Sequence, residues 1–420
     1  MLRKSLSVFA VAPLLFVLAS TSVSALEIGW AKVELTPPFS TPLAGYGKRF
    51  GKASTGVHDP LFARALIISG NGEKIAVVSA DLLLIHRELR EEVAKRVAPL
   101  QLSSLLLCAT HTHSGVGGYW DNFIAETLGM GWYERRILDF LVERLVAAIR
   151  QANDKLIRAK MGRTVEVFHD LSINRRHRGK AVASEIAVIR FDSLDGKPQA
   201  AIVNFAAHPT ILGPDNRLVS ADYPGVVSRV LEKHVSVALF APGAAADLTP
   251  RRVIRSRDKF QSVDAYGNKV GALAVRMLDG TRTSERASLK SRTLDVQLPQ
   301  ATTAGAMGDS LAFFVDPMFR RFVPHTTRLQ AVALNSDVLT AWPGEVASDF
   351  QQALNKVDRK SANGGSRWIF STANDHIGYI QTEQEYALGG YETSLSLFGP
   401  ELGSRLLKHL VGMIRELSEK

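Results

Sequence analysis

The feature that most constrains the fold of this 420-residue chain is the steady alternation of short apolar runs with amphipathic segments. Runs rich in branched and apolar residues predict β-strands at residues 64–68, 74–79, 105–109, 185–191, 199–205, 236–240, 329–334 and 338–342. Apolar residues spaced three to four apart predict helices at residues 86–97, 133–151, 225–234, 263–278, 346–356 and 401–417. This order predicts an α/β fold of mixed α+β character, with packed mixed β-sheets flanked by helices. No linker interrupts the pattern, so we expect a single large domain.

The first 25 residues have the composition of a secretory signal peptide. Arg3 and Lys4 precede an apolar stretch at residues 6–19, and small residues lead up to Ala25, where we predict cleavage. The apolar stretch is shorter than the ~20 residues that a membrane span requires, and no later stretch is comparable. We therefore expect a soluble mature protein, residues 26–420, that is secreted or periplasmic.

Cysteine content and charge exclude several other classes. Cys108 is the only cysteine, so no disulfide can form within the chain, and the cysteine-rich motifs of structural zinc sites are missing. Removal of Arg3 and Lys4 lowers the formal charge from +10 to +8, which leaves a basic surface. Such a surface attracts anionic lipid or acidic polymer, but no nucleic-acid-binding motif accompanies it, so we expect no nucleic-acid partner. The sequence does not predict the oligomeric state.

A His-x-His pair follows one of the predicted strands. Residues 110–115 read Thr-His-Thr-His-Ser-Gly, so His111 and His113 come directly after a buried strand. On a strand, side chains two apart point to the same face, so both imidazoles would face one cleft at the carboxyl edge of a sheet. Imidazole is the commonest protein ligand for zinc, and the pair therefore predicts a catalytic metal site. The alternative is that both rings only bond backbone groups at the strand end.

Two further strand ends deliver polar side chains. Residues 204–210 end a predicted strand and place His208 just before a proline, which makes His208 a second candidate ligand. Pro343 and Gly344 end another strand, and Glu345 follows them at what we predict to be the start of a helix. Helix capping is the alternative role for Glu345, because carboxylates stabilise helix N-termini.

These motifs resemble those of the neutral/alkaline (non-lysosomal) ceramidase amino-terminal domain family. The similar segments are residues 56–58, 63–65, 110–119, 174–175, 204–210, 343–345, 379–386, 391–392 and 398–400. They keep the family's order and extend over essentially all of residues 26–420. The chain ends at Lys420, so we expect a short form without the additional carboxyl-terminal β-domain of the full-length enzymes.

The resemblance implies a zinc-dependent amidohydrolase that cleaves the N-acyl amide bond of ceramide by a metal-activated water. Carried over by position, one Zn²⁺ would be held by His111, His208, Glu345 and Tyr379. Zinc lowers the pKa of a bound water from ~15.7 toward ~7 and polarises a carbonyl. His113 matches no ligand of the family, and it would carry a proton to the leaving amine or support the substrate.

Four other positions carry expectations from the same resemblance. Arg175 and Tyr391 match positions near the substrate and would hold a developing oxyanion or a hydroxyl. Gly243 stands where the family carries a serine with an active role, and glycine offers no hydroxyl, so no acyl-enzyme can form there. Asp247 is retained and would orient a zinc-bound histidine.

The substrate of the leading hypothesis is a ceramide-like lipid or another N-acyl small molecule, and the segment at residues 302–327 bears on it. Long ordered loops are often lids, and this segment carries Phe313, Phe314, Phe319 and Phe322 beside Arg320 and Arg321. As a lid it would suit a lipid taken up through peripheral membrane contact, whereas the alternative is that the rings cap the core.

Two competing functions remain open. One is a metal-dependent amidase or esterase for soluble substrates, which a closed polar pocket would favour over an open apolar channel. The other is a metal-retaining binding protein without turnover, which a closed ligand shell would favour.

Overall fold

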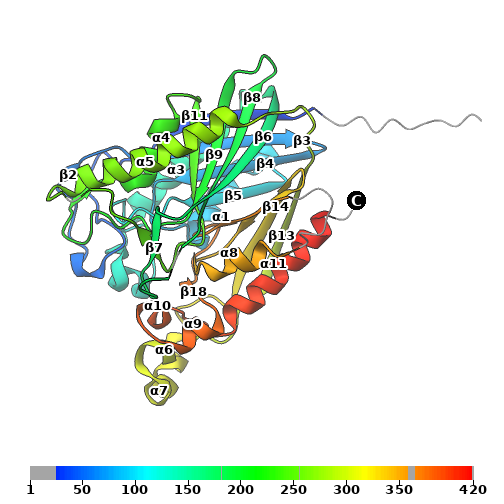
Figure 1. Ribbon diagram of the computed structural model, residues 1–420. Coiled ribbons are helices and arrows are strands. Elements are labelled where there is room, and N and C mark those ends of the chain that lie inside the picture. The colour runs from blue at the N-terminus through cyan, green and yellow to red at the C-terminus, as the bar shows by residue number, and fades with distance from the viewer. Residues whose placement is uncertain (1–24, 181, 255, 358–364, 419–420) are drawn as a thin grey trace, which may run out of the picture.

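Two mixed β-sheets packed face to face form the centre of the computed structural model, which describes residues 25–180, 182–254, 256–357 and 365–418 (Figure 1). The larger sheet has the order β11-β9-β8-β6-β1-β3-β4-β5, and the smaller has the order β13-β14-β15-β17. The predicted signal peptide, except for Ala25, lies outside the described residues. Within them, no helix has the length and apolar character needed to cross a membrane.

The strands of the larger sheet are β1 (Glu27–Glu34), β3 (Phe62–Gly70), β4 (Glu73–Ala80), β5 (Ser104–Ala109), β6 (Ile157–Phe168), β8 (Ser184–Ser193), β9 (Pro198–Phe205) and β11 (Val237–Pro242). Those of the smaller sheet are β13 (Leu289–Gln297), β14 (Thr326–Leu334), β15 (Asp337–Ala341) and β17 (Arg367–Phe370). Three short pairings join β2 (Gly56–Val57) to β10 (Leu218–Val219), β7 (Ser172–Asn174) to β12 (Leu248–Pro250), and β16 (Glu345–Val346) to β18 (Tyr379–Ile380).

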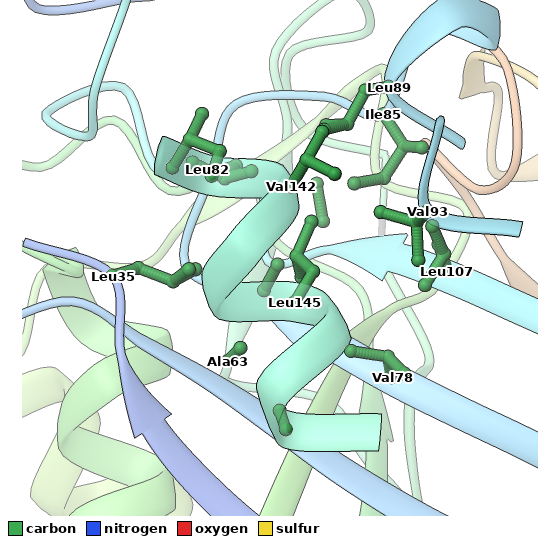
Figure 2. Packing of buried hydrophobic residues seen from close by; sticks show 14 of the residues in the cluster. Leu35, Ala63, Val78, Leu82, Ile85, Leu89, Val93, Leu107, Val142 and Leu145 are labelled. Atoms are coloured by element: carbon green, nitrogen blue, oxygen red, sulfur yellow. The ribbon is translucent and has the colours of Figure 1, made fainter. Parts of the chain in front are cut away.

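Alternating side chains decide which layer each face of a strand meets. Ala63, Ala65 and Ile67 of β3 pack toward helices, whereas Leu66 and Ile68 pack between the two sheets. Six helices cover the outer faces: α1 (Arg87–Val97), α3 (Arg135–Asn153), α4 (Asp222–Leu231), α5 (Lys259–Gly280), α8 (Asp349–Leu354) and α11 (Leu402–Ser418). Figure 2 shows α3, whose Val142 and Leu145 lie against the strands. The result is a helix, sheet, sheet, helix sandwich, which confirms the predicted fold class.

The larger sheet bends until its two ends meet. β5 and β11 are the outermost strands in the order, yet β11 lies against β3, β4 and β5. The buried hydroxyl of Ser79 on β4 donates to the carbonyl of Phe240 on β11 at 2.6 Å. Within the strand pairings of the described residues, the two halves of the sheet meet only at Glu27 and Ile28 of β1, which pair with β6. This short seam lets the halves turn toward each other and brings the carboxyl ends of β5, β9 and β11 together.

The structure corrects two of the predicted elements. Glu345 does not begin a helix: it belongs to β16, and α8 starts only at Asp349, because Glu345 pairs with the strand β18. The segment at residues 302–327 is not a loop, since it contains α6 (Ala304–Met307) and α7 (Asp309–Phe319). Cys108 lies in the strand predicted at residues 105–109 and is buried, and burial raises the pKa of its thiol.

Short helical turns complete the fold around the site. They are η1 (Gly47–Arg49), η2 (Ala98–Leu100), α2 (Phe123–Ala125), the π-helical turn η3 (Glu126–Met130), α9 (Glu383–Ala387) and α10 (Tyr391–Ser394). Most of them surround the carboxyl ends of β5 and β18 rather than cover the sheets.

Candidate functional site

Three imidazoles meet where the ends of β5 and β9 come together. The Nε2 atom of His208 lies 3.1 Å from Nε2 of His111 and 3.1 Å from Nε2 of His113, and the latter two atoms are 3.3 Å apart. The side chains converge for a different reason than strand alternation. β5 ends at Ala109, and His111 has a φ of 67°, in the left-handed region, so the chain turns sharply at that residue. The three rings together could hold a metal ion.

The hydrogen bonds of the rings decide where their protons lie. Each Nδ1 bonds a backbone carbonyl: Leu83 for His111, Gly45 for His113 and Ala245 for His208, at 2.7, 3.0 and 3.3 Å. A carbonyl only accepts, so Nδ1 carries the proton and the Nε2 of a neutral ring carries a lone pair. Burial lowers the pKa of His113 to about 3 and that of His208 well below its usual value, which disfavours a second proton on either of these two rings. Convergent lone pairs of this kind fit a cation.

Glu345 adds a carboxylate to the same point. Its Oε2 lies 3.4 Å from Nε2 of His111 and 3.5 Å from Nε2 of His208. This oxygen is buried and accepts no hydrogen bond from the part of the chain that the structure describes. Burial alone raises the pKa of Glu345, but attraction to His111 and His208 outweighs it and holds the pKa well below its usual value. A buried, ionised oxygen without a donor is costly, which again fits a metal ion.

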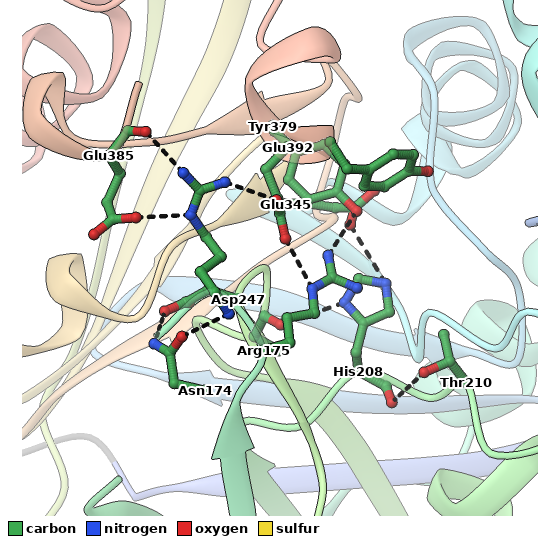
Figure 3. Close-up of polar contacts among 12 residues, drawn as sticks. Asn174, Arg175, His208, Thr210, Asp247, Glu345, Tyr379, Glu385 and Glu392 are labelled. Atoms are coloured by element: carbon green, nitrogen blue, oxygen red, sulfur yellow. Dashed lines mark hydrogen bonds and ion pairs between the residues drawn. The ribbon is translucent and has the colours of Figure 1, made fainter. Parts of the chain in front are cut away.

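Tyr379 lies beside Glu345 because β16 and β18 run parallel with these two residues opposite each other. Opposite residues of a strand pair share a face. The Tyr379 hydroxyl accepts a hydrogen bond from Nη2 of Arg175 at 3.2 Å (Figure 3). Burial, followed by the charge of Glu345, raises the pKa of Tyr379 well above its usual value. A phenolate at this position therefore requires a nearby cation.

A partly buried ion-pair network holds Arg175 in place. Its Nε donates to Oε1 of Glu392 at 2.9 Å, and Arg176 donates to Oε2 of Glu392 at 2.7 Å and to Glu385 at 2.7 Å (Figure 3). Tyr391, the neighbour of Glu392, has its ring centre 6.0 Å from that of Tyr379 and is largely exposed. The structure thus places Arg175 and Tyr391 at the site, and their contact with substrate stays a prediction.

Asp247 does not have the role expected from the sequence. Its carboxylate accepts from the backbone nitrogen and the hydroxyl of Ser348, at 2.8 and 2.7 Å, and from Nδ2 of Asn174 at 2.7 Å. Among the described residues these donors occupy both oxygens, and none of them is a histidine. The carbonyl of Ala245 orients His208 instead. Asp247 therefore ties the residues after β16 to β7.

Gly243, the position of the family's serine, lies directly after β11. Its backbone nitrogen donates to the carbonyl of Phe205, the last residue of β9, at 2.9 Å. It is buried beside Ala206, two residues before His208. Gly243 therefore lies in space beside the segment that carries a candidate ligand, although it provides no side chain for chemistry.

An apolar pocket begins at the metal candidates. Its wall includes Glu345, His113 and Tyr379 at one end, and the remaining lining is mostly apolar: Leu83, Leu84, Trp120, Ile124, Leu128, Met130, Phe322, Val323, Pro324, Ile377, Leu395, Leu397 and Phe398. Leu128 and Phe322 are also exposed, so the pocket reaches the surface. This is the apolar channel that the lipid hypothesis requires.

Sequence reasoning missed two residues of the site. His376 lines the pocket, burial lowers its pKa to about 4, and its Nδ1 has no hydrogen-bond partner among the described residues. Arg49 is buried and donates to five backbone carbonyls, those of Ala44, His113, Gly213, Pro214 and Asn216. His376 lies three residues before Tyr379, which is a usable signal, whereas nothing around Arg49 in the sequence distinguishes it from a solvated arginine.

Comparison with known proteins finds relatives along most of the chain. A family model described as neutral/alkaline non-lysosomal ceramidase, N-terminal, matches residues 26–250, more than half of the chain. Neutral ceramidase A of Dictyostelium discoideum is 28% identical over an alignment of 505 residues that covers 90% of this chain and 70% of the relative. The crystal structure of neutral ceramidase from Pseudomonas aeruginosa has a TM-score of 0.81 at 20% identity, over 94% of this chain and 74% of that one. A ceramidase complexed with C2 has a TM-score of 0.82 at 20% identity, over 94% and 75%.

Proposed function

Because this chain belongs to the neutral/alkaline non-lysosomal ceramidase family, we propose that it is a zinc-dependent hydrolase that cleaves the N-acyl amide bond of a ceramide-like lipid. The observation that carries the proposal is the convergence of three imidazole nitrogens and one carboxylate oxygen at the end of an apolar pocket. The relatives named neutral ceramidase support an amide lipid as substrate. The apolar lining supports an acyl or sphingoid chain over a soluble substrate.

The residues present fit one divalent ion. His111, His208 and Glu345 would hold it, and either Tyr379 or His113 is close enough in the fold to complete the set. Nitrogen and oxygen ligands suit zinc and also accept manganese or iron. When bound, such an ion acts as a Lewis acid on the amide carbonyl and lowers the pKa of water.

The chain's own groups account for the remaining chemistry. The Arg175 guanidinium, fixed by Glu392 on one side and bonded to Tyr379 on the other, is placed to stabilise negative charge that develops on the carbonyl oxygen. His113 keeps its Nε2 unprotonated through the bond from Nδ1 to Gly45, so it can take a proton from the attacking water and return it to the leaving amine.

Water is the direct nucleophile in this proposal. Gly243 has no hydroxyl, so no acyl-enzyme forms at the position where the resemblance implies a serine. The apolar lining from Leu83 to Phe398 holds the acyl or sphingoid chain and excludes bulk water from it.

The test uses purified residues 26–420 with the bound metal quantified. We expect one zinc per chain and faster cleavage of fluorescent ceramide than of a short N-acyl amine or an ester. His111→Ala and His208→Ala should each lose metal and activity, whereas His409→Ala, an exposed histidine on α11, should change neither. If either ligand variant keeps its metal and hydrolyses substrate at the wild-type rate, the assignment is refuted. Cleavage of only the short substrates would identify a soluble amidase, and stoichiometric metal without any hydrolysis would identify a binding protein.

We further propose that residues 1–25 direct export. The support is the sequence pattern around Arg3, Lys4 and Ala25 alone. Mass spectrometry of protein recovered from the periplasm or medium should find Leu26 as the first residue, and an intact Met1 would contradict the proposal.

A further inference from the structure

Helix α7 projects from one end of the molecule (Figure 1). Several of its apolar side chains are exposed to solvent. The exposed fractions are 76% for Phe313, 76% for Phe314, 63% for Met318 and 51% for Leu311. The two phenylalanine rings lie edge to face with centres 5.3 Å apart. Isolated exposed apolar residues are ordinary, but four on one 11-residue helix form a contiguous patch that indicates an interaction surface.

The apolar patch continues to the mouth of the pocket. Phe322, three residues beyond α7, is exposed and lines the pocket. Its carbonyl accepts from Nδ2 of Asn122 at 2.9 Å, which ties it to the start of α2, where Phe123 is exposed. Leu128 and Tyr391 also line the pocket and are exposed. The pocket therefore opens onto an apolar face of the protein.

The base of the α6 and α7 segment is firmly attached, so the apolar side chains are held outward. The buried carboxylate of Asp316 accepts from the backbone nitrogen and the hydroxyl of Thr303, at 2.7 and 2.9 Å. Gly305 of α6 packs so closely on α10 that a Cβ there would lie 2.3 Å from the carbonyl oxygen of Thr393. The segment is thus anchored on one side, where Phe319 also packs against the core, while Phe313 and Phe314 stay exposed.

Positive charge borders the apolar patch. Arg320 and Arg321 follow the last residue of α7. Arg320 is engaged with Asp316 and the carbonyl of Ala301, whereas the exposed Arg321 makes no hydrogen bond or ion pair through its side chain with the described residues. Aromatic and aliphatic side chains flanked by arginine are the composition that binds at the interface of an anionic bilayer.

We propose that α7 and the rim of the pocket insert into the surface of an anionic phospholipid bilayer, so that a lipid substrate passes from the bilayer into the pocket without crossing water. The delivery of substrate to the pocket rests on the proposed lipid hydrolysis, whereas membrane binding itself does not require catalysis. Charge favours a bilayer over a second copy of this chain, since two copies of residues 26–420 would each bring Arg321 and a formal net charge of +8 to the contact.

The first measurement is sedimentation of the purified protein with vesicles of phosphatidylcholine, alone or mixed with phosphatidylglycerol. Phe313→Ser combined with Phe314→Ser should lower the partition coefficient by about tenfold or more, because two apolar anchors are lost. The matched control is Val167→Ser combined with Leu194→Ser. It removes two exposed apolar side chains far from α7 in the sequence, one in β6 and one directly after β8, and should leave partitioning unchanged. Arg321→Glu should weaken binding to the anionic vesicles and not to pure phosphatidylcholine.

The second measurement separates this inference from the proposed function. The Phe313 and Phe314 double variant should hydrolyse a dissolved short-chain N-acyl amine at the wild-type rate and a vesicle-embedded substrate more slowly. His208→Ala, inactive under the proposed function, should still sediment with vesicles. Vesicle binding without hydrolysis of any substrate refutes the function and leaves the membrane contact standing. Equal partitioning of the double variant and the wild type overturns the membrane contact. So does a wild-type protein that does not bind vesicles but forms a concentration-dependent dimer that the double variant cannot form.

Discussion

Replacing Gly243 with serine tests whether the reaction runs without a side-chain nucleophile. The substitution restores the hydroxyl that the family resemblance places at this position. The backbone of Gly243 is not in the left-handed region, so an L side chain is conformationally acceptable. Because water attacks directly in the proposed mechanism, we expect Gly243→Ser to fold, bind metal and turn over.

The cost of the change follows from the space around Gly243. A Cβ at this position would lie 3.1 Å from Cβ of Ala206 and 3.5 Å from its backbone nitrogen. The ends of β11 and β9 must therefore separate by a few tenths of an ångström. Overpacking of this size costs about 1 to 3 kcal/mol, and a single tight contact belongs at the lower end. A shift of about 1 kcal/mol corresponds to roughly a fivefold change in a rate, so we expect kcat/KM to fall by less than about tenfold.

Gly243→Ala is the matched control, because it adds the same Cβ without the hydroxyl. Urea unfolding, metal content and kcat/KM on ceramide should agree between the two variants. A folded, metal-loaded serine variant that loses activity more than about a hundredfold, while the alanine variant keeps it, would contradict the direct attack of water. A burst of released sphingoid base in the serine variant alone would show that an acyl-enzyme route opens when a hydroxyl is present.

Three further substitutions test the structure around the site. Arg49→Met leaves five backbone carbonyls without their donor, including that of His113, and should lower the free energy of unfolding in urea by about 3 kcal/mol; an unchanged midpoint would contradict the assigned bonds. Burial holds the pKa of His86 at about 3 in the folded state, while an unfolded histidine titrates near 6.5. The unfolded state therefore binds the extra proton, and stability should fall by about 1 kcal/mol between pH 6 and pH 5 from this residue alone. His86→Asn should remove that part of the pH dependence, and an identical slope in the variant would refute it. Tyr379→Phe deletes only a hydroxyl next to Glu345 and should weaken zinc binding, measured by chelator competition, by roughly tenfold; unchanged affinity would exclude Tyr379 as a ligand and favour His113.

The apolar periodicity of the sequence predicted most of the strands and helices that bury one apolar face. All eight predicted strands overlap strands of the two sheets, and the helices at α1, α3, α5 and α11 begin and end close to their predicted bounds. Four strands of the two sheets were missed: charged or half-exposed positions interrupt the apolar pattern of β1, β6 and β13, and β17 has only four residues. Glu345 was assigned to a helix because a Pro-Gly pair precedes it, and only the pairing with β18 shows why it is extended.

Two kinds of candidate residue could be identified from the chain alone: histidines at the ends of buried strands and a carboxylate after a Pro-Gly turn are local facts of the sequence. The significance of Gly243 came only from the family resemblance. The convergence of the candidate residues could not be identified from the chain alone, because His111 and His208 are 97 residues apart and meet only when the larger sheet bends. The tautomers of the rings, the unpaired oxygen of Glu345 and the outward face of α7 likewise depend on neighbours from distant segments. Local propensity acts between residues that are close along the chain, whereas burial and hydrogen bonding are settled by the packing of the whole domain.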